Sequence, residues 1–466
     1  MGFTVIDTVI LVVYLLGVAA LGILRGGRQS TAQDYFLGKE TIGWGVVCFS
    51  IVAAETSTLT FISIPGLAYI SNLSFLQVTF GYLLGRIVVS FVFLPAYYKG
   101  DLSTAYAFLE RRFGQKTRRF ASIIFLFTRI SADGVRLFAT AIPLKLVLDI
   151  DYPLAILILA VVAFAYTFAG GVRGVIWVDA VQMFIYLGGA LVACAVLVLM
   201  AEGGFTGLTA AALENGKFTL FDVGFGGDFF QRPYTLIAGL LGGAFLSMAS
   251  HGTDQLVVQR LLTTKSLRSS QKALIGSGLI IIVQFAIFLM VGLLLHGHYG
   301  GASVAELGLR RSDEIFPTFI IQGLPAGVSG LIIAGLMAAA LSTLAGSMSS
   351  MASSTVLDLV RPMMGERWSE ERGLQLSRRV TAIAALALVG AAVFFMTTSQ
   401  TVVELALSIA SFTYGRLLGT FLLGVLFRRP TQEDALAGFV AGIFVMMTVI
   451  SLKLVAWTWF TVIGVS

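Results

Sequence analysis

Long apolar runs recur along the whole sequence, and most are close to the 20 residues that an α-helix needs to cross a bilayer. Apolar residues make up 57% of the 466-residue chain and charged residues 12%, against about 25% in soluble proteins. We therefore predict an all-α polytopic membrane protein with about 13 transmembrane helices. The runs lie near 4–25, 43–70, 74–97, 120–148, 153–170, 174–201, 233–258, 272–296, 327–358, 377–398, 402–427, 434–452 and, as a short thirteenth, 455–466.

Basic residues gather in alternate loops between these runs. Pairs such as Arg111–Arg112, Arg378–Arg379 and Arg428–Arg429 follow odd-numbered runs, whereas the opposite loops hold few. Because cytoplasmic loops carry the excess of Lys and Arg, the N-terminus is expected outside a cytoplasmic membrane. The first run has Asp7 before its core and no basic segment ahead of it, so we predict a retained helix rather than a signal peptide.

Two runs are interrupted by polar residues. The second contains AAETST, residues 53–58, and the seventh contains SMASHGTDQ, residues 247–255. The two runs begin five helices apart, and corresponding interruptions of this kind indicate inverted repeats with a binding site near the middle of the membrane. We expect an accessory helix and loop over 1–42, five-helix repeats over 43–202 and 233–428, an extracellular loop over 203–232 and accessory helices over 429–466.

The ninth run is rich in hydroxyl groups, with serines and threonines from Ser342 to Thr355. These residues can form a small-residue packing face in which hydroxyls bond back to the helix backbone. Alternatively, Ser342 and Thr343 offer oxygen ligands to a hard cation, together with carbonyls freed by the break in the second run.

Four stretches resemble the sodium:solute symporters, the solute carrier 5-like family of bacterial proline, galactose and sialic acid carriers and of mammalian glucose, iodide and monocarboxylate carriers. They are FSIVAAETSTLTFISIPGLAY, FAGGVRGVIWVDAVQ, GTDQLVVQRLL and AAALSTLAGSMSSMASSTVLDL. Their order and spacing extend over nearly the whole chain. The resemblance implies a LeuT-like core, a five-plus-five inverted repeat with additional helices before and after it.

The resemblance also implies a sodium site. Its ligands would be the carbonyls of Ala53, Thr56 and Ala339 and the hydroxyls of Ser342 and Thr343. Some members hold a second sodium with a hydroxyl pair one turn further along and an aspartate. Here Asp179 is present but the pair is replaced by Ala345 and Gly346, so we expect one ion per cycle. Asp179 is either an ion relay or a partner for a helix end or Arg173.

Charged residues inside the fourth and second runs suggest a solute site, because charge within the membrane is costly. Arg129, Asp133 and Arg136 share one helix face. An Arg129–Asp133 ion pair would leave Arg136 without a carboxylate partner on its own helix. Arg136 is then either a ligand for a solute carboxylate or a partner for Glu55. Glu55 departs from the neutral residues of better-known relatives, and we expect it to pair with Arg136 when no solute is bound.

Family geometry places further polar side chains beside this site. Tyr414 and Arg416 would line an inner gate or extend toward the cytoplasm, and we favour the second alternative. The other candidate solute ligands are Ser57, Thr60, Gln77, Thr79, Ser247, Ser250 and His251.

We predict a sodium-coupled symporter, not an enzyme, that imports a small anionic or zwitterionic solute of the carboxylate, sialic acid or amino acid type. It would act as a monomer by alternating access. A proton-coupled carrier using Glu55 or Asp179 is the main alternative. A membrane sensor would need a soluble domain, and no metal-spaced histidines, nucleophile–base pair or phosphate loop supports an enzyme.

Overall fold

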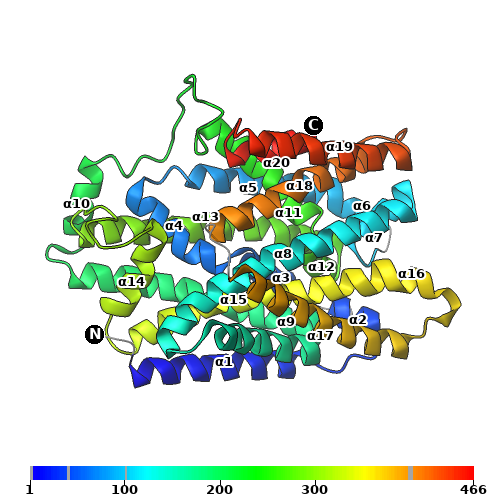
Figure 1. The fold of residues 1–466 in the computed structure, drawn as a ribbon, viewed down its shortest axis with the longest axis horizontal. Helices are drawn as coiled ribbons and strands as arrows, with labels where there is room; N and C mark the ends of the chain where they lie inside the picture. The colour runs from blue at the N-terminus through cyan, green and yellow to red at the C-terminus, as the bar shows by residue number, and fades with distance from the viewer. Residues whose placement is uncertain (1–3, 39–41, 100–101, 397–401) are drawn as a thin grey trace.

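A computed structural model describes residues 4–38, 42–99, 102–396 and 402–466, with no side-chain description over 402–413. Regular structure in these ranges is helical, and the long helices run roughly along one axis (Figure 1). Seven of the described helices are long and apolar enough to cross a membrane, or eight when one bent pair counts as a span. The all-helical membrane architecture is as predicted, while the number of about 13 spans stays a prediction.

The first half of the chain contains two short helices at one end of the bundle and one at the other. α2 and α7 lie at the end opposite α10 (Figure 1). The elements are α1 (Val5–Gly26), α2 (Ala32–Leu37), α3 (Trp44–Glu55), α4 (Thr58–Ile70), α5 (Leu76–Val88), π-helical η2 (Val89–Phe93), α6 (Leu94–Lys99), α7 (Ala105–Phe113), α8 (Gln115–Leu148), α9 (Tyr152–Met200) and α10 (Gly204–Glu214).

The second half contains the longest stretch of buried helix, α15, and ends in a helix pair at the edge of the bundle (Figure 1). The elements are η3 (Ala238–Gly242), α11 (Gly243–Gly252), α12 (Gln255–Leu262), α13 (Leu267–His298), η4 (Ser312–Glu314), α14 (Ile315–Gln322), α15 (Val328–Ser353), η5 (Ser354–Val360), α16 (Arg361–Met364), η6 (Gly365–Arg367), α17 (Glu370–Phe395), α18 (Val402–Leu426), α19 (Gln432–Ser451), η7 (Trp457–Trp459) and α20 (Phe460–Val465).

Both predicted interruptions are present. α3 and the following helix are bent by 63° at a short break, and α11 and α12 are separated by Thr253 and Asp254. α9 also changes direction inside, at Gly171, whose φ of 56° and ψ of −162° are not helical. That position matches the predicted boundary between the fifth and sixth runs.

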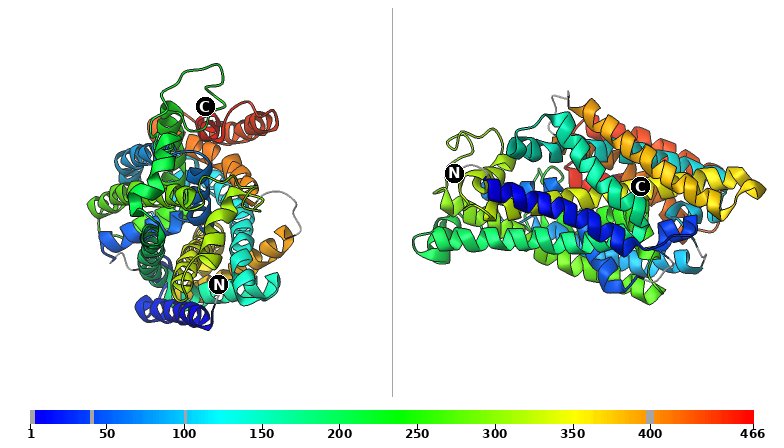
Figure 2. Two further views of the ribbon diagram at one scale, coloured as in Figure 1. Left: turned by 90° about the vertical axis from the view of Figure 1, so that its left-hand side faces the viewer. Right: turned by 90° about the horizontal axis from the view of Figure 1, so that it is seen from below.

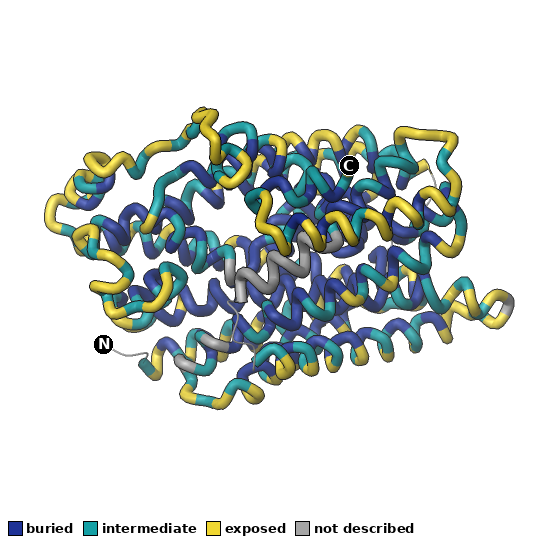
Figure 3. Tube along the Cα trace, turned by 45° about the horizontal axis from the view of Figure 1, so that its top comes forward, coloured by how far each residue is buried: buried dark blue, intermediate teal, exposed yellow. Residues whose placement is uncertain are grey.

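Apolar side chains cover the outside of the bundle as well as its interior. Seen end-on, the helices surround central ones (Figure 2), and exposed positions gather on the outer faces (Figure 3). Leu16, Leu24, Phe184 and Phe444 are among the exposed large apolar residues. An outer surface of this kind suits contact with lipid rather than water.

Glycines let two of the central helices pack with their backbones close together. A side chain at Gly81 or Gly85 of α5 would collide with backbone atoms of Gly239 or Ala244, and one at Gly243 would collide with the backbone of Val78. α5 and α11 are therefore held at a distance that only small residues allow. This contact sets the position of α11, which precedes the second break.

Candidate functional site

The break between α3 and α4 leaves backbone carbonyls without helical partners. Thr56 and Ser57 both have extended backbone, with ψ of 105° and 165°. The last carbonyls of α3 therefore lose the donors that a continuing helix would supply. The Ser57 hydroxyl caps α4 by accepting a hydrogen bond from the Thr60 amide at 3.3 Å. A helix C-terminus favours cations, so this end of α3 is suited to a sodium ion.

α15 packs against both α3 and α4, and its Ser342 shares the Asp179 carboxylate with Ser50 of α3. Ala53, Ala339, Ser342 and Thr343 are all buried. The Thr343 hydroxyl donates to the Ala339 carbonyl at 3.2 Å. Donation leaves the lone pairs of the Thr343 hydroxyl available to a cation. These residues thus provide oxygen donors of the type that a sodium ion requires.

Asp179, on α9, binds the same part of α15. Its Oδ1 accepts a hydrogen bond from Ser342 at 2.7 Å, and its Oδ2 accepts from Ser50 at 2.7 Å and from Arg260 Nη2 at 2.8 Å. The suggested pairing with Arg173 is wrong, because Arg260 of α12 is the cationic partner. A side chain at Gly346 would meet the Arg260 guanidinium, so the glycine makes room for it.

The Thr56 side chain fixes the end of α3 rather than facing an ion. Its hydroxyl donates to the Val52 carbonyl at 2.9 Å and accepts from the Gln284 amide at 2.8 Å. The Tyr186 hydroxyl lies 3.2 Å from the same oxygen. Helices α9 and α13 therefore hold the break in place, and the role of the Thr56 carbonyl as an ion ligand stays a prediction.

Glu55, the last residue of α3, forms an ion pair with Arg86 of α5. The expected pair with Arg136 is wrong, since Arg136 Nη1 donates to Asp133 Oδ1 at 2.7 Å. His251 Nε2 lies 3.5 Å from the same carboxylate, so the structure does bring His251 to Glu55. α5 and α11 can both reach Glu55 because of their close glycine contact.

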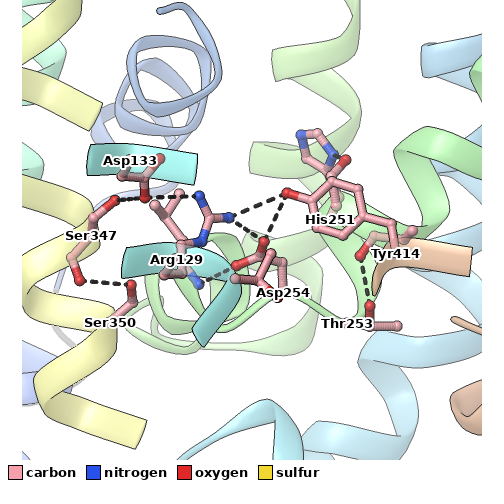
Figure 4. Close-up of polar contacts among 12 residues, drawn as sticks. Arg129, Asp133, His251, Thr253, Asp254, Ser347, Ser350 and Tyr414 are labelled. Carbon is pink, nitrogen blue, oxygen red and sulfur yellow. Dashed lines mark hydrogen bonds and ion pairs between the residues drawn. The ribbon is translucent and has the colours of Figure 1, made fainter. Parts of the chain in front are cut away.

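A second charged cluster joins four parts of the chain beside the second break (Figure 4). Arg129 of α8 pairs with Asp254, and Tyr414 of α18 donates to Asp254 at 3.0 Å. Arg129 also lies 3.3 Å from Asp133, which accepts a hydrogen bond from Ser347 of α15. We call Arg129, Asp133, Asp254, Ser347 and Tyr414 the inner network.

The inner network changes two sequence predictions. Asp133 binds both Arg129 and Arg136, so Arg136 is not left unpaired by an Arg129–Asp133 pair. Its side chain is 28% exposed, however, and retains donors beyond the one bound to Asp133. Tyr414 binds Asp254 instead of extending toward the cytoplasm.

Other predicted solute ligands differ in their surroundings. Arg136 lies near the start of α4. The evidence is Thr140, one turn beyond Arg136 on α8, whose hydroxyl lies 3.1 Å from the hydroxyl of Thr58, the first residue of α4. Gln77 donates instead to the carbonyls of Ser74 and Tyr234. The remaining predicted residues bond locally or are buried: Ser57 with Thr60, Thr79 with its own helix, Ser250 with the His251 ring, and Ser247 buried without a hydrogen bond from its hydroxyl.

Sequence reasoning missed Arg86, Arg260, Tyr186 and Gln284. Arg86 could have been found, because it lies within the apolar run LLGRIVV and a charge at membrane depth is itself a functional signal. Arg260 directly follows the seventh run, 233–258, where the sequence pattern indicates a loop and not a buried site. Tyr186 and Gln284 lie in long apolar helices, where the sequence does not indicate which face meets the break.

The fold and this arrangement of broken helices define a secondary transporter, and comparison with known proteins gives its family. The model of the sodium:solute symporter family matches residues 35–442. The chain belongs to this family, and it is a sodium-coupled symporter with a LeuT-like fold.

Individual relatives extend over almost the full chain. This chain is 29% identical to the sodium/sialic acid symporter NanT of Aliivibrio fischeri, and the match covers 99% of this chain and 91% of NanT. It is 26% identical to the sodium/sialic acid symporter SiaT of Proteus mirabilis, and that match covers 96% of this chain and 89% of SiaT. A solved substrate-bound, outward-open sodium-coupled sialic acid symporter superimposes with a TM-score of 0.89 at 26% identity, covering 99% and 96%. The transporter Mhp1 shares the fold alone, with a TM-score of 0.55 and 12% identity.

Proposed function

We propose that this protein imports a small organic carboxylate, anionic or zwitterionic, by coupling it to one sodium ion. The sodium would bind the carbonyls of Ala53, Thr56 and Ala339 and the hydroxyls of Ser342 and Thr343. Asp179 would serve that ion as a relay or as support for Ser342. The protein would act as a monomer in the cytoplasmic membrane of a bacterium, with its N-terminus outside.

The observation that carries this proposal is the break between α3 and α4, two helices against which the hydroxyl-bearing α15 packs. The C-terminal end of α3 attracts a cation, and the N-terminal end of α4 attracts an anionic group. The break therefore offers a site that favours a cation directly beside a site that favours an anion. Arg136, partly exposed near the start of α4, adds a guanidinium suited to a carboxylate.

Sialic acids are candidate solutes, because the relatives named above are sialic acid symporters and such sugars carry a carboxylate. The inner network beside the second break supports an arrangement closed toward the cytoplasm. The likeness to an outward-open symporter favours the same state. Sodium and solute would then enter from outside, and the inner network would open to release them.

The test is thermal stability of the purified protein in sodium or potassium, with sialic acids, amino acids, sugar acids and simple carboxylates added in turn. A ligand that binds only the folded state raises the melting temperature. We expect sodium alone to raise it and one carboxylate class to raise it further. Ser342→Ala should remove the sodium effect, while Ser350→Ala, a buried serine two turns along α15 that bonds to the Ser347 carbonyl, should retain it.

Equal melting temperatures in sodium and potassium, with and without solutes, would contradict the proposed sodium site. That result would favour the proton-coupled alternative. Uptake into vesicles driven by a pH gradient would then distinguish the two, with Glu55 as the first residue to substitute.

A further inference from the structure

The buried ion pair between Arg86 and Glu55 is placed at the break, yet no part of the sodium site uses it. Arg86 has no exposed surface, and its Nη1 donates to the Ser277 hydroxyl of α13 at 2.7 Å. Its Nη2 pairs with Glu55. A buried guanidinium with a carboxylate partner is strongly held, because removing either partner leaves an uncompensated charge.

The two oxygens of Glu55 have different surroundings. Oε2 is bound by Arg86 and lies 3.5 Å from His251 Nε2. Among the described residues, none hydrogen bonds to Oε1. The Glu55 side chain is 21% exposed, against 0% for Arg86 and 2% for His251. The positive end of the pair is therefore enclosed by protein, and the negative end is open.

Further polar atoms around Glu55 are buried without a hydrogen-bond partner in the described part of the chain. They are the Ser247 hydroxyl, one turn from His251 on α11, and Arg86 Nε. His251 Nδ1 lies 2.8 Å from the Ser250 hydroxyl and 3.2 Å from the Ser247 carbonyl, which fixes the ring. Buried polar groups are normally hydrogen bonded, so atoms left over beside an open carboxylate indicate a place for ligand groups.

We propose that Glu55, held by Arg86 and His251, determines solute specificity by accepting hydrogen bonds from an ammonium or hydroxyl group of the solute. This inference rests on the proposed function and narrows its solute class. An ionised carboxylate only accepts hydrogen bonds and repels another carboxylate. The solute must therefore present donors to Glu55 and place its own carboxylate elsewhere, near α4 and Arg136. A carboxylate without donor groups would not satisfy Glu55.

The experiment compares matched carboxylates at one concentration in sodium, with thermal stability of the wild-type protein as the readout. One set is propionate, lactate and alanine, which carry no donor, a hydroxyl and an ammonium group beside the carboxylate. A ring-sized set is cyclohexanecarboxylate, glucuronate and N-acetylneuraminate. We expect a rise in melting temperature only from acids that carry donors.

Two substitutions test the residues themselves. Glu55→Gln and Arg86→Lys should weaken binding of the active acid by about tenfold or more, because each disturbs a charge-assisted hydrogen bond. A single cooperative melting transition in each variant shows that it is folded. Glu110→Gln and Arg118→Lys are matched controls, since these residues form another Glu–Arg pair between α7 and α8. They should bind the acid as the wild type does.

The outcomes separate this inference from the proposed function. Equal rises from acids with and without donors, or unchanged binding in a folded Glu55→Gln variant, would overturn the inference and leave sodium symport of a carboxylate standing. If Glu55→Gln does not fold, the wild-type comparison decides, together with Ser247→Ala, which should weaken binding. A wild-type protein that responds to sodium but to none of the acids would overturn the solute class and the inference together.

Discussion

At the scale of residues, Asp179 orients Ser342, which is one of the proposed sodium ligands. The Ser342 hydroxyl donates a hydrogen bond to Asp179 at 2.7 Å, so the lone pairs of the Ser342 oxygen stay free for a cation. Arg260 and Ser50 occupy the other carboxylate oxygen. Residues that orient a metal ligand in this way commonly change metal affinity strongly when they are substituted.

We predict that Asp179→Asn lowers sodium affinity by about 10- to 100-fold, because Asn has one acceptor oxygen and cannot accept from both Ser342 and the Arg260–Ser50 side as the two carboxylate oxygens do. The measurement is the sodium concentration that gives half of the rise in melting temperature, with potassium as the reference for each variant. Asp222→Asn, in the Asp222–Arg232 ion pair outside the proposed site, is the matched control and should leave the sodium midpoint unchanged. A normal sodium midpoint in Asp179→Asn would show that Ser342 needs no such partner.

Sequence could predict the chemistry of these residues but not all of their partners. The hydroxyls of α15 and the charge on Glu55 and Asp179 stand out in apolar runs. Asp179 was matched to the nearby Arg173, whereas its partner Arg260 is 81 positions away. Glu55 was matched to Arg136 and pairs with Arg86. Such pairs depend on which helix faces meet, and that is decided by packing between distant segments.

At the scale of elements, the long helices are interrupted where the chain has a specific reason to stop. Ser57 and Asp254 each follow a break and cap the next helix, accepting hydrogen bonds from Thr60 and Leu256. Gly171 interrupts α9 through a positive φ. Polar residues within an apolar run are visible in the sequence, and this is why the first two interruptions could be predicted, while the bend at Gly171 falls at the predicted boundary between two runs. The π-helical segments η2, η3 and η5 carry no such signal.

Gly171→Ala should destabilise the protein. A residue with a side chain is strained at φ 56°, and its Cβ would come within 2.8 Å of the Tyr35 carbonyl oxygen on α2. We expect a loss of about 1–3 kcal/mol in unfolding free energy, seen as a lower melting temperature. Gly188→Ala, in the same helix with no atom within 4 Å of the new Cβ, is the control. It should be neutral or slightly stabilising. Equal melting temperatures for the two variants would contradict this account of the kink.

At the scale of the whole molecule, the inner network ties together helices from both predicted repeats. Arg129 belongs to α8, Asp254 lies between α11 and α12, Ser347 belongs to α15 and Tyr414 to α18 (Figure 4). Movement of any one of these elements away from the others breaks a charged or hydrogen-bonded contact. The inner network is therefore placed to hold one side of the transporter closed.

Tyr414→Phe removes from the inner network the hydrogen bond to Asp254 at 3.0 Å and the one accepted from Arg129 at 3.3 Å, and should favour opening toward the cytoplasm. A bond worth about 1 kcal/mol corresponds to about a fivefold change in the open population. The measurement is maleimide labelling, from the cytoplasmic side, of Ser350→Cys in a chain with Cys48 and Cys194 replaced by alanine. We expect labelling about five times faster. Tyr299→Phe is the control, because Tyr299 caps the C-terminal end of α13 and is not part of the inner network. It should have no effect on labelling. Unchanged labelling in Tyr414→Phe would mean that Asp254 does not hold the inner side closed through Tyr414.

The break between α3 and α4 has a consequence for the energetics of transport. Ala53 and Thr56, proposed for the ion, flank Glu55, proposed for the solute, within four consecutive residues. Any shift of this segment on binding one ligand alters the site for the other. In a closed thermodynamic cycle, the factor by which solute strengthens sodium binding equals the factor by which sodium strengthens solute binding. The stiffness of one short stretch of backbone would therefore set how tightly the two fluxes are coupled, and a more flexible break would allow sodium to leak across without its solute.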